Sequence, residues 1–193
     1  LAKKGEGLLL SGWTKPARHA VAASYLGWTL DAFDFFILTF VLPDVAAQFG
    51  VSIPTVAFSV TLTLFFRPVG AFIFGRLADH YGRRHVFAIN IACYSLFAFL
   101  TAFSPSLTGF LVIRSLFGVA MGGIWGVGAS LALESVKPGH RGFVSGLMQT
   151  GYPTGSLLAA FAYGVFYSLI GWRGLFMLGL APAVLLIPYI ETC

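Results

Sequence analysis

The chain has 193 residues, of which 58% are hydrophobic and only 10% are charged, and its net charge is +5. An ordinary soluble domain has roughly 25% charged residues, so this composition excludes both a soluble globular protein and a disordered one. The 23 glycines and 9 prolines suit close-packed transmembrane helices, which tolerate these residues better than soluble helices do. We therefore expect an all-α, multi-pass integral membrane protein.

Six segments are long and apolar enough to cross a membrane, which takes about 20 residues per helix. The predicted spans cover residues 17–43, 54–75, 86–103, 107–132, 143–169 and 171–190. Pro43, Pro105, Pro138 and Gly171 mark joints between them, because proline cannot continue a helix and glycine ends one at little cost.

The basic residues sort by side of the membrane. Nine of the twelve fall in the N-terminal tail, after the second span or after the fourth: Lys3, Lys4, Lys15, Arg18, Arg76, Arg83, Arg84, Lys137 and Arg141. Cytoplasmic segments are enriched in Lys and Arg, so we expect both ends of the chain to be cytoplasmic. Residues 1–16 are then a lead-in to a membrane domain at 17–190. The positive charge indicates loops near anionic lipid and no nucleic-acid partner.

Four ionisable residues fall well inside the predicted spans: Asp31, Asp34, Arg67 and Arg114. Each costs about 2.5–3.5 kcal/mol at mid-bilayer, so each should face protein or water and have a partner. Asp31 and Asp34 share one face of their helix with Ser24 and Gly27, whereas Phe33 and Ile37 lie on the other side, so we expect the polar face to point inward. Two alternatives remain open: these charges serve a transport pathway, or they form a static ion network that fixes helix packing.

Weaker signals come from polar residues and glycines in the later spans. Gln149 and Tyr152 line a cavity or simply hydrogen-bond between helices. Gly118, Gly122 and Gly126 recur every fourth residue, which predicts close helix packing. The sequence contains no spacing typical of a metal site, a nucleotide-binding loop or a catalytic nucleophile. We therefore expect no enzyme, no cofactor and no metal.

The segment from Gly75 to Arg84 reads GRLADHYGRR. It resembles the G-x-x-x-D-x-x-G-R-R/K signature between helices 2 and 3 of major facilitator superfamily transporters. Gly75 and Gly82 are expected to allow tight turns, and Asp79 to accept hydrogen bonds from a helix end or from Arg83 or Arg84. In that family the motif is a conformational latch and not a substrate site.

Other segments are similar to the same family. Arg114 followed by Gly118 resembles its helix 4, Glu134 and Arg141 resemble its helix 4–5 joint, and the GWR run at 171–173 resembles the opening of its helix 6. The resemblance implies the N-terminal, six-helix half of a twelve-helix fold, built as a 3+3 inverted repeat.

On this reading a C-terminal half is missing, and residues 191–193 begin the central loop. The missing half is then a partner of this chain, together with membrane lipid.

Three segments narrow the resemblance to proton symporters. Residues 30–36, LDAFDFF, resemble the D-x-x-D stretch of symporters for sialic acid and for lactate or related carboxylates. Residues 122–126 and 146–152 look closest to yeast-type lactate permeases. The resemblance implies alternating-access symport of a small organic anion with a proton, with lactate or another monocarboxylate as the main prediction. A sialic acid or aromatic-acid symporter is the alternative, and a channel or membrane sensor is a remote one.

The chemistry of the charged residues gives them expected roles in such a symporter. An arginine, Arg114 above all, would bind the anion as a planar fork, and an aspartate would carry the proton. Asp34 is the expected proton carrier, although nothing in the sequence distinguishes the two aspartates for this role. The expected substrate and proton pathway comprises Asp31, Asp34, Arg67, Arg114, Gln149 and Tyr152. The expected latch comprises Gly75, Asp79, Gly82, Arg83, Arg84, Glu134 and Arg141.

Overall fold

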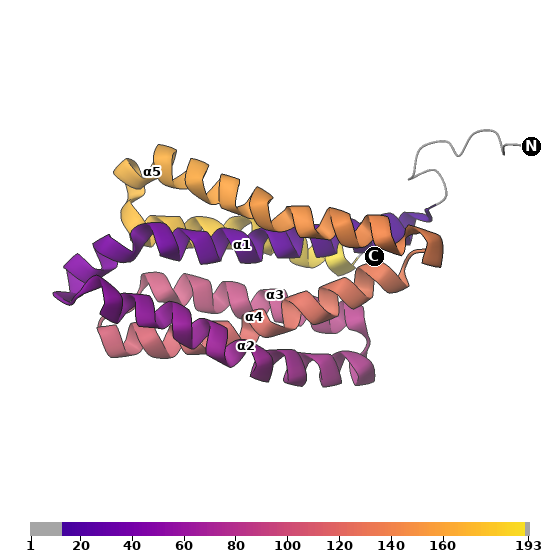
Figure 1. Ribbon diagram of the computed structural model, residues 1–193, viewed down its shortest axis with the longest axis horizontal. Helices are drawn as coiled ribbons and strands as arrows, with labels where there is room; N and C mark the ends of the chain where they lie inside the picture. The colour runs from indigo at the N-terminus through magenta and orange to yellow at the C-terminus, as the bar shows by residue number, and fades with distance from the viewer. Residues whose placement is uncertain (1–12, 192–193) are drawn as a thin grey trace, which may run out of the picture.

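The computed structural model describes residues 13–191, so most of the predicted lead-in and the last two residues lie outside the described part. The elements are α1 (Lys15–Phe49), α2 (Ile53–Tyr81), α3 (Arg83–Ala102), α4 (Leu107–Glu134), a short 3-10 helix η1 (Pro138–His140) and α5 (Arg141–Glu191). Figure 1 shows the helices lying side by side along one long axis. The described chain is all-α, as the composition predicts.

The helix labelled α5 consists of two arms joined at a sharp turn. Gly171 has φ 62° and ψ −176°, which is not helical, and the chain reverses direction there (Figure 1). Glycine adopts a positive φ at little cost, whereas a residue with a Cβ is strained. The arms, residues 141–170 and 172–191, measure about 45 and 30 Å at 1.5 Å per residue. The predicted break at Gly171 is confirmed.

The predicted end of the first helix at Pro43 is wrong. The helix α1 continues through Pro43 to Phe49, and it ends at Gly50, which has φ 65° and whose N–H bonds back to Ala46 and Ala47. A proline removes one backbone hydrogen bond but does not stop a helix whose neighbours hold it in place. The left-handed glycine is the physical terminator here.

Four helical stretches of the described chain are long and apolar enough to cross a membrane: α2, α3, α4 and residues 138–190. The last stretch contains both arms of α5. The helix that carries Asp31 and Asp34, α1, is not among the four. The result is a multi-pass helical membrane domain.

Glycines let the helix backbones approach closely at two contacts. A Cβ added at Gly118 of α4 would lie 2.3 Å from Thr63 O of α2. A Cβ added at Gly122 would lie 2.0 Å from Arg67 O of the same helix. Likewise, a Cβ at Gly155 of α5 would lie 2.3 Å from Thr29 O of α1. The packing role predicted for the α4 glycines is confirmed at positions 118 and 122. It is wrong at Gly126, where a Cβ would meet nothing within 4 Å.

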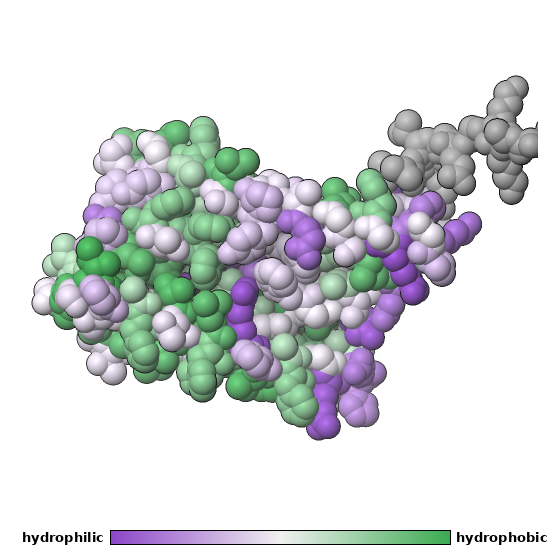
Figure 2. All heavy atoms as spheres, viewed as in Figure 1, coloured by the Kyte–Doolittle hydropathy of each residue, from purple (hydrophilic) through white to green (hydrophobic). Residues whose placement is uncertain are grey.

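The two ends of the bundle differ in chemistry. The start of α1 and the end of α5 lie at the same end as the connections after α2 and α4, which we call the basic end. Figure 2 shows hydrophilic residues gathered there, a few more near the middle of the visible face, and mainly apolar residues toward the opposite end.

The opposite, far end contains Gly171 and is tied to the last turns of α1. There the Tyr167 hydroxyl donates to Asp44 Oδ1, and Trp172 Nε1 donates to Gln48 Oε1 at 2.8 Å.

Candidate substrate and coupling site

Two aspartates stand on α1 in the middle of the bundle. Asp31 is fully buried and Asp34 is 2% exposed. The predicted inward face of α1 is confirmed, because Ser24 and Gly27 on the same face are also buried. Phe33 and Ile37, predicted for the other side of the helix, are buried as well. The reason is that α1 packs against α5 and α4 and also contacts α2.

Asp31 is held by donors from two other helices. Arg67 Nη2 of α2 donates to Asp31 Oδ2 at 2.9 Å, and Trp125 Nε1 of α4 donates to the same oxygen at 2.8 Å. The guanidinium of Arg67 also lies 5.3 Å from the Trp125 ring centroid. Asp31 and Arg67, both predicted as pathway residues, therefore form one charge pair. Charge-assisted bonds of this kind offset the cost of burying an acid.

Arg67 faces a pocket as well as Asp31. A pocket of about 270 Å³ lies between α2 and α4, lined by Leu64, Arg67, Pro68, Ala71, Gly122 and Trp125. The Arg67 side chain keeps 23% of its surface exposed, while Asp31 keeps none. Arg67 Nε makes no hydrogen bond within the described chain. The guanidinium group thus retains unused donor capacity, and the exposed part of the side chain lies at the pocket.

Aromatic rings surround this charge pair. Trp28 stacks on Trp125 with centroids 4.5 Å apart, and Tyr152 meets Trp125 edge-on at 6.2 Å. Phe36 packs on Tyr152 at 5.3 Å. Tyr152, a predicted pathway residue, therefore belongs to the same site. Gln149 is exposed one helical turn earlier.

Asp34 and Arg114 form a second buried charged position in the bundle. Arg114 is fully buried, with its guanidinium 4.2 Å from the Phe117 ring centroid and 5.8 Å from that of Phe176. It is the opposite charge that acts on Asp34, but no ion pair within 4.0 Å joins them in the described chain. The three guanidinium nitrogens of Arg114 and Asp34 Oδ1 lack hydrogen-bond partners among the described residues. Of the two arginines, Arg67 lines the pocket between α2 and α4 and Arg114 does not.

Two contributors were missed by sequence reasoning. Trp125 follows Arg114 by eleven residues, three helical turns, which places both on one side of α4. That periodicity could have identified it. Gly179 in the second arm of α5 is the other, since a Cβ there would lie 2.6 Å from Asp34 Oδ1. No local signal pairs Gly179 with Asp34.

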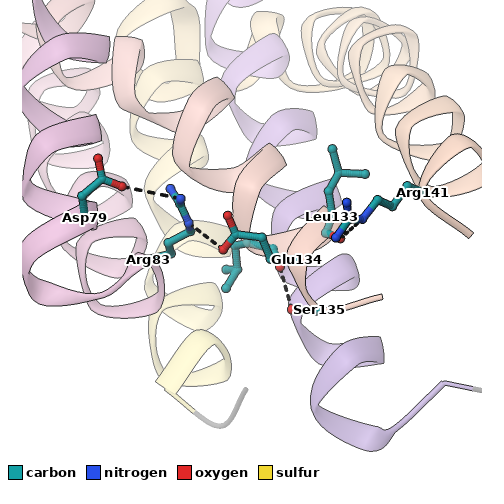
Figure 3. A network of polar contacts seen from close by, with 7 residues as sticks. Asp79, Arg83, Leu133, Glu134, Ser135 and Arg141 are labelled. Carbon is teal, nitrogen blue, oxygen red and sulfur yellow. Dashed lines mark hydrogen bonds and ion pairs between the residues drawn. The ribbon is translucent and has the colours of Figure 1, made fainter. Parts of the chain in front are cut away.

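The predicted latch residues meet at the basic end. Arg83 Nη2 lies 3.5 Å from Asp79 Oδ1, and Arg83 Nε donates to Glu134 Oε2 at 2.7 Å, which links α3 to α4 (Figure 3). Arg141 Nε donates to Leu133 O at 3.1 Å. Arg84 instead donates to Ile190 O at 2.9 Å.

The two predicted turn glycines behave differently. Gly82 has φ 88° between α2 and α3, so its turn is confirmed. The turn predicted at Gly75 is wrong, because Gly75 lies inside α2 and does not have a positive φ.

Comparison with known families decides the identity of this fold. The model of the Major Facilitator Superfamily matches residues 24–190. The chain belongs to this superfamily. Its members are membrane transporters and not enzymes. The inward-open xylose transporter XylE from E. coli matches 92% of this chain and 48% of its own, with a TM-score of 0.81 at 18% identity. This likeness shows the fold, half of a major facilitator transporter.

Curated relatives in the superfamily carry several transport names. A probable 4-methylmuconolactone transporter of Cupriavidus pinatubonensis is 32% identical over 86% of this chain. The benzoate transport protein of Acinetobacter baylyi is 34% identical over 84% of it, and the sialic acid transporter NanX of Escherichia coli is 28% identical over 93%. The chain covers 40%, 36% and 45% of these relatives, respectively. It therefore spans about two fifths of their length.

Proposed function

We propose that this chain forms part of a proton-coupled secondary transporter for ring-containing organic acids, working by alternating access. A sialic acid or aromatic-acid symporter is the sequence-based alternative to a lactate symporter. The relatives named for methylmuconolactone, benzoate and sialic acid support that alternative. Lactate gains no specific support from them. The single observation that carries the proposal is the partly exposed Arg67 beside Trp125 in the pocket.

The substrate carboxylate binds Arg67. A guanidinium presents a planar fork of donors that matches a carboxylate, and Arg67 uses only part of this fork on Asp31. The ring of the substrate packs against Trp125 and Tyr152, whose faces and edges supply apolar area at low conformational cost. Lactate has no ring to use this surface.

Asp34 carries the transported proton in this proposal. A buried carboxyl group beside a buried arginine is ionised when the two pair and neutral when they separate. Asp34 and Arg114 are buried but not in contact, so a small shift of α1 against α4 would change the charge of the pair. Moving Asp34 is therefore the step that couples proton entry to the rearrangement.

The proposed topology has six membrane crossings in a domain at 17–190, with the two arms of α5 crossing separately. Both ends of that domain are cytoplasmic, because the basic residues gather at the end where it starts and finishes. A second half, absent from this chain, completes the transport path and faces the pocket. The residues around Arg83 act as the conformational latch between states.

The test is uptake by the full-length protein in proteoliposomes. Labelled benzoate, sialic acid and lactate are offered with and without an inward proton gradient. We expect gradient-driven accumulation of a ring-containing acid. The variant Arg67→Lys should raise the KM about tenfold or more, since an ammonium cannot reproduce the fork.

The matched control is Arg76→Lys, which changes an exposed arginine on the same helix away from the pocket. It should leave the KM unchanged. Accumulation of lactate alone would refute the substrate assignment, and equal uptake without a gradient would refute symport.

A further inference from the structure

The second arm of α5, residues 172–191, lies against both members of the buried pair Asp34 and Arg114. Phe176 of this arm is fully buried, and its ring centroid lies 5.8 Å from the guanidinium carbon of Arg114. A Cβ added at Gly179 would lie 2.6 Å from Asp34 Oδ1 and 3.5 Å from the carboxyl carbon. Residues 176 and 179 are three apart, so they share one face of the helix. One face of the second arm therefore meets the aspartate of α1 and the arginine of α4.

Gly179 leaves the Asp34 carboxyl group a place beside the backbone of the second arm. A contact of 2.6 Å is too short for a Cβ, so a side chain at position 179 would displace the carboxyl group. Asp34 Oδ1 is buried and has no hydrogen-bond partner among the described residues. No bond of this oxygen to another described side chain therefore resists the displacement. The position of Asp34 in this structure depends on a glycine at 179.

The titratable groups that act on Asp34 come from three helices. Arg114 of α4 is the opposite charge and Asp31 of α1 is a like charge. Tyr94 of α3 is a buried neutral hydroxyl that also interacts with Asp34 electrostatically. The arginine of α2 bonds to Asp31 instead, and the second arm of α5 brings uncharged residues to this position. A carboxylate displaced from the second arm therefore has one favourable charge to approach, that of Arg114.

We propose that Gly179 and Phe176 are positioning residues for proton coupling, which hold Asp34 and Arg114 apart while the carboxyl group takes up its proton. Phe176 keeps the guanidinium group near the second arm through a cation–π contact, and Gly179 keeps a place for the neutral carboxyl group. Pairing with an arginine favours the ionised carboxylate, so the separation sets the pH at which Asp34 takes up a proton. The inference rests on the proposed role of Asp34 as the proton carrier.

The test is proton-driven uptake of labelled benzoate by the full-length protein in proteoliposomes, measured over a series of pH values at a fixed pH difference across the membrane. Gly179→Ala should move the pH of half-maximal uptake lower by about 1 pH unit, because the displaced carboxylate pairs with Arg114. Gly164→Ala, on the first arm and facing open space, should leave the pH profile unchanged. In the Asp34→Asn background, Gly179→Ala should not shift the pH profile of substrate exchange, because position 34 no longer titrates.

A second variant keeps the proposal testable where Gly179→Ala does not fold. Phe176→Leu keeps an apolar side chain but removes the ring face, so Arg114 is released toward Asp34 and the pH profile should shift in the same direction. Phe161→Leu, exposed on the first arm, is its control.

An unshifted pH profile in a folded Gly179→Ala or Phe176→Leu variant would overturn the positioning role. The result for Asp34→Asn separates this failure from that of the proposed function. Loss of accumulation in Asp34→Asn with an unshifted Gly179→Ala profile would refute the positioning role alone. Accumulation at the wild-type level in Asp34→Asn would refute the carrier role of Asp34, and the positioning role with it.

Discussion

At the scale of single residues, one carboxylate oxygen organises the candidate site. Asp31 Oδ2 accepts from Arg67 on α2 and from Trp125 on α4, so a single atom of α1 joins three helices. A buried acid is tolerated only when charges and donors surround it, and removing one donor leaves a cost that the remaining donor does not cover. The hydrogen bond from Trp125 therefore stabilises the fold at the candidate site.

The variant Trp125→Phe tests this bond, because it keeps a ring and removes the Nε1 donor. We expect it to lower the free energy of unfolding by about 1.5–3 kcal/mol, the range for a hydrogen bond to a charged group. Thermal unfolding of the purified protein in detergent measures the loss. The control Trp172→Phe removes a bond to the neutral Gln48 and should cost about 0.5–1.5 kcal/mol. A loss for Trp125→Phe no greater than the control would contradict the prediction.

Asp34→Asn tests proton coupling in the full-length protein. It removes the titratable group and keeps the side-chain volume. The proton gradient should then no longer drive accumulation, so the substrate should only reach equal concentrations on both sides, while exchange of substrate across the membrane persists. Exchange needs no net proton movement, so counterflow of labelled substrate serves as the internal control. Accumulation at the wild-type level would show that Asp34 is not the carrier and would favour the static ion network as its role.

At the scale of helices, the contact between α2 and α4 depends on residues without side chains. Gly118 and Gly122 lie against backbone atoms of α2, which brings Arg67 close to Trp125. Close backbone approach is what small residues provide between membrane helices, where the hydrophobic effect does not drive association. The geometry of the charge pair thus rests on glycine spacing.

Replacing Gly122 with Ala would place its Cβ 2.0 Å from Arg67 O, so the helices must separate. We expect a destabilisation of about 1–3 kcal/mol, typical of overpacking, together with weaker substrate binding because Arg67 moves. Gly126→Ala, one turn away and facing open space, is the matched control. Thermal unfolding and substrate affinity should both be unaffected in the control. Similar losses in both variants would mean that glycine flexibility, and not spacing, matters.

The sequence predicted the helices and the four intramembrane charges because hydropathy and charge are local properties. It did not predict that Asp31 pairs with Arg67 while Asp34 faces Arg114, because pairing depends on the rotation of each helix against its neighbours. The wrong end at Pro43 has a related cause, since neighbouring helices support a proline that an isolated helix would not tolerate. The packing prediction for Gly126 was wrong for a similar reason. Glycines at every fourth residue do not show where two helices diverge.

At the scale of the whole molecule, the basic end carries two ion pairs of Arg83, with Asp79 and with Glu134, in addition to the Asp31–Arg67 pair in the middle of the bundle. Arg83 reaches Glu134 on another helix at 2.7 Å, whereas its contact to Asp79, four residues away, is 3.5 Å. All three side chains are partly exposed, so each pair contributes little to stability. In the proposed latch, their effect is on the balance between conformations.

We expect Glu134→Gln to lower turnover by up to about fivefold, with a smaller effect for Asp79→Asn, because only the former removes the bond between α3 and α4. The substrate KM should stay unchanged in both variants. Initial rates at saturating substrate and at a series of lower concentrations separate the two quantities. A raised KM with an unchanged maximal rate would place these residues in the binding site instead.

The contacts at Gly171 have a mechanical consequence. Asp44 and Gln48 near the end of α1 bond to Tyr167 and Trp172, one on each side of the turn, so α1 and both arms of α5 share a fixed point at the far end. Any tilt of α1 against those arms must pivot there, and the displacement grows with distance from the pivot. From Asp44 to Lys15 the lever is about 44 Å long, so a 5° tilt would move the basic end by about 4 Å. Asp34, only about 15 Å from the pivot, would move by about 1 Å, which is the scale on which a buried acid makes or breaks contact with an arginine.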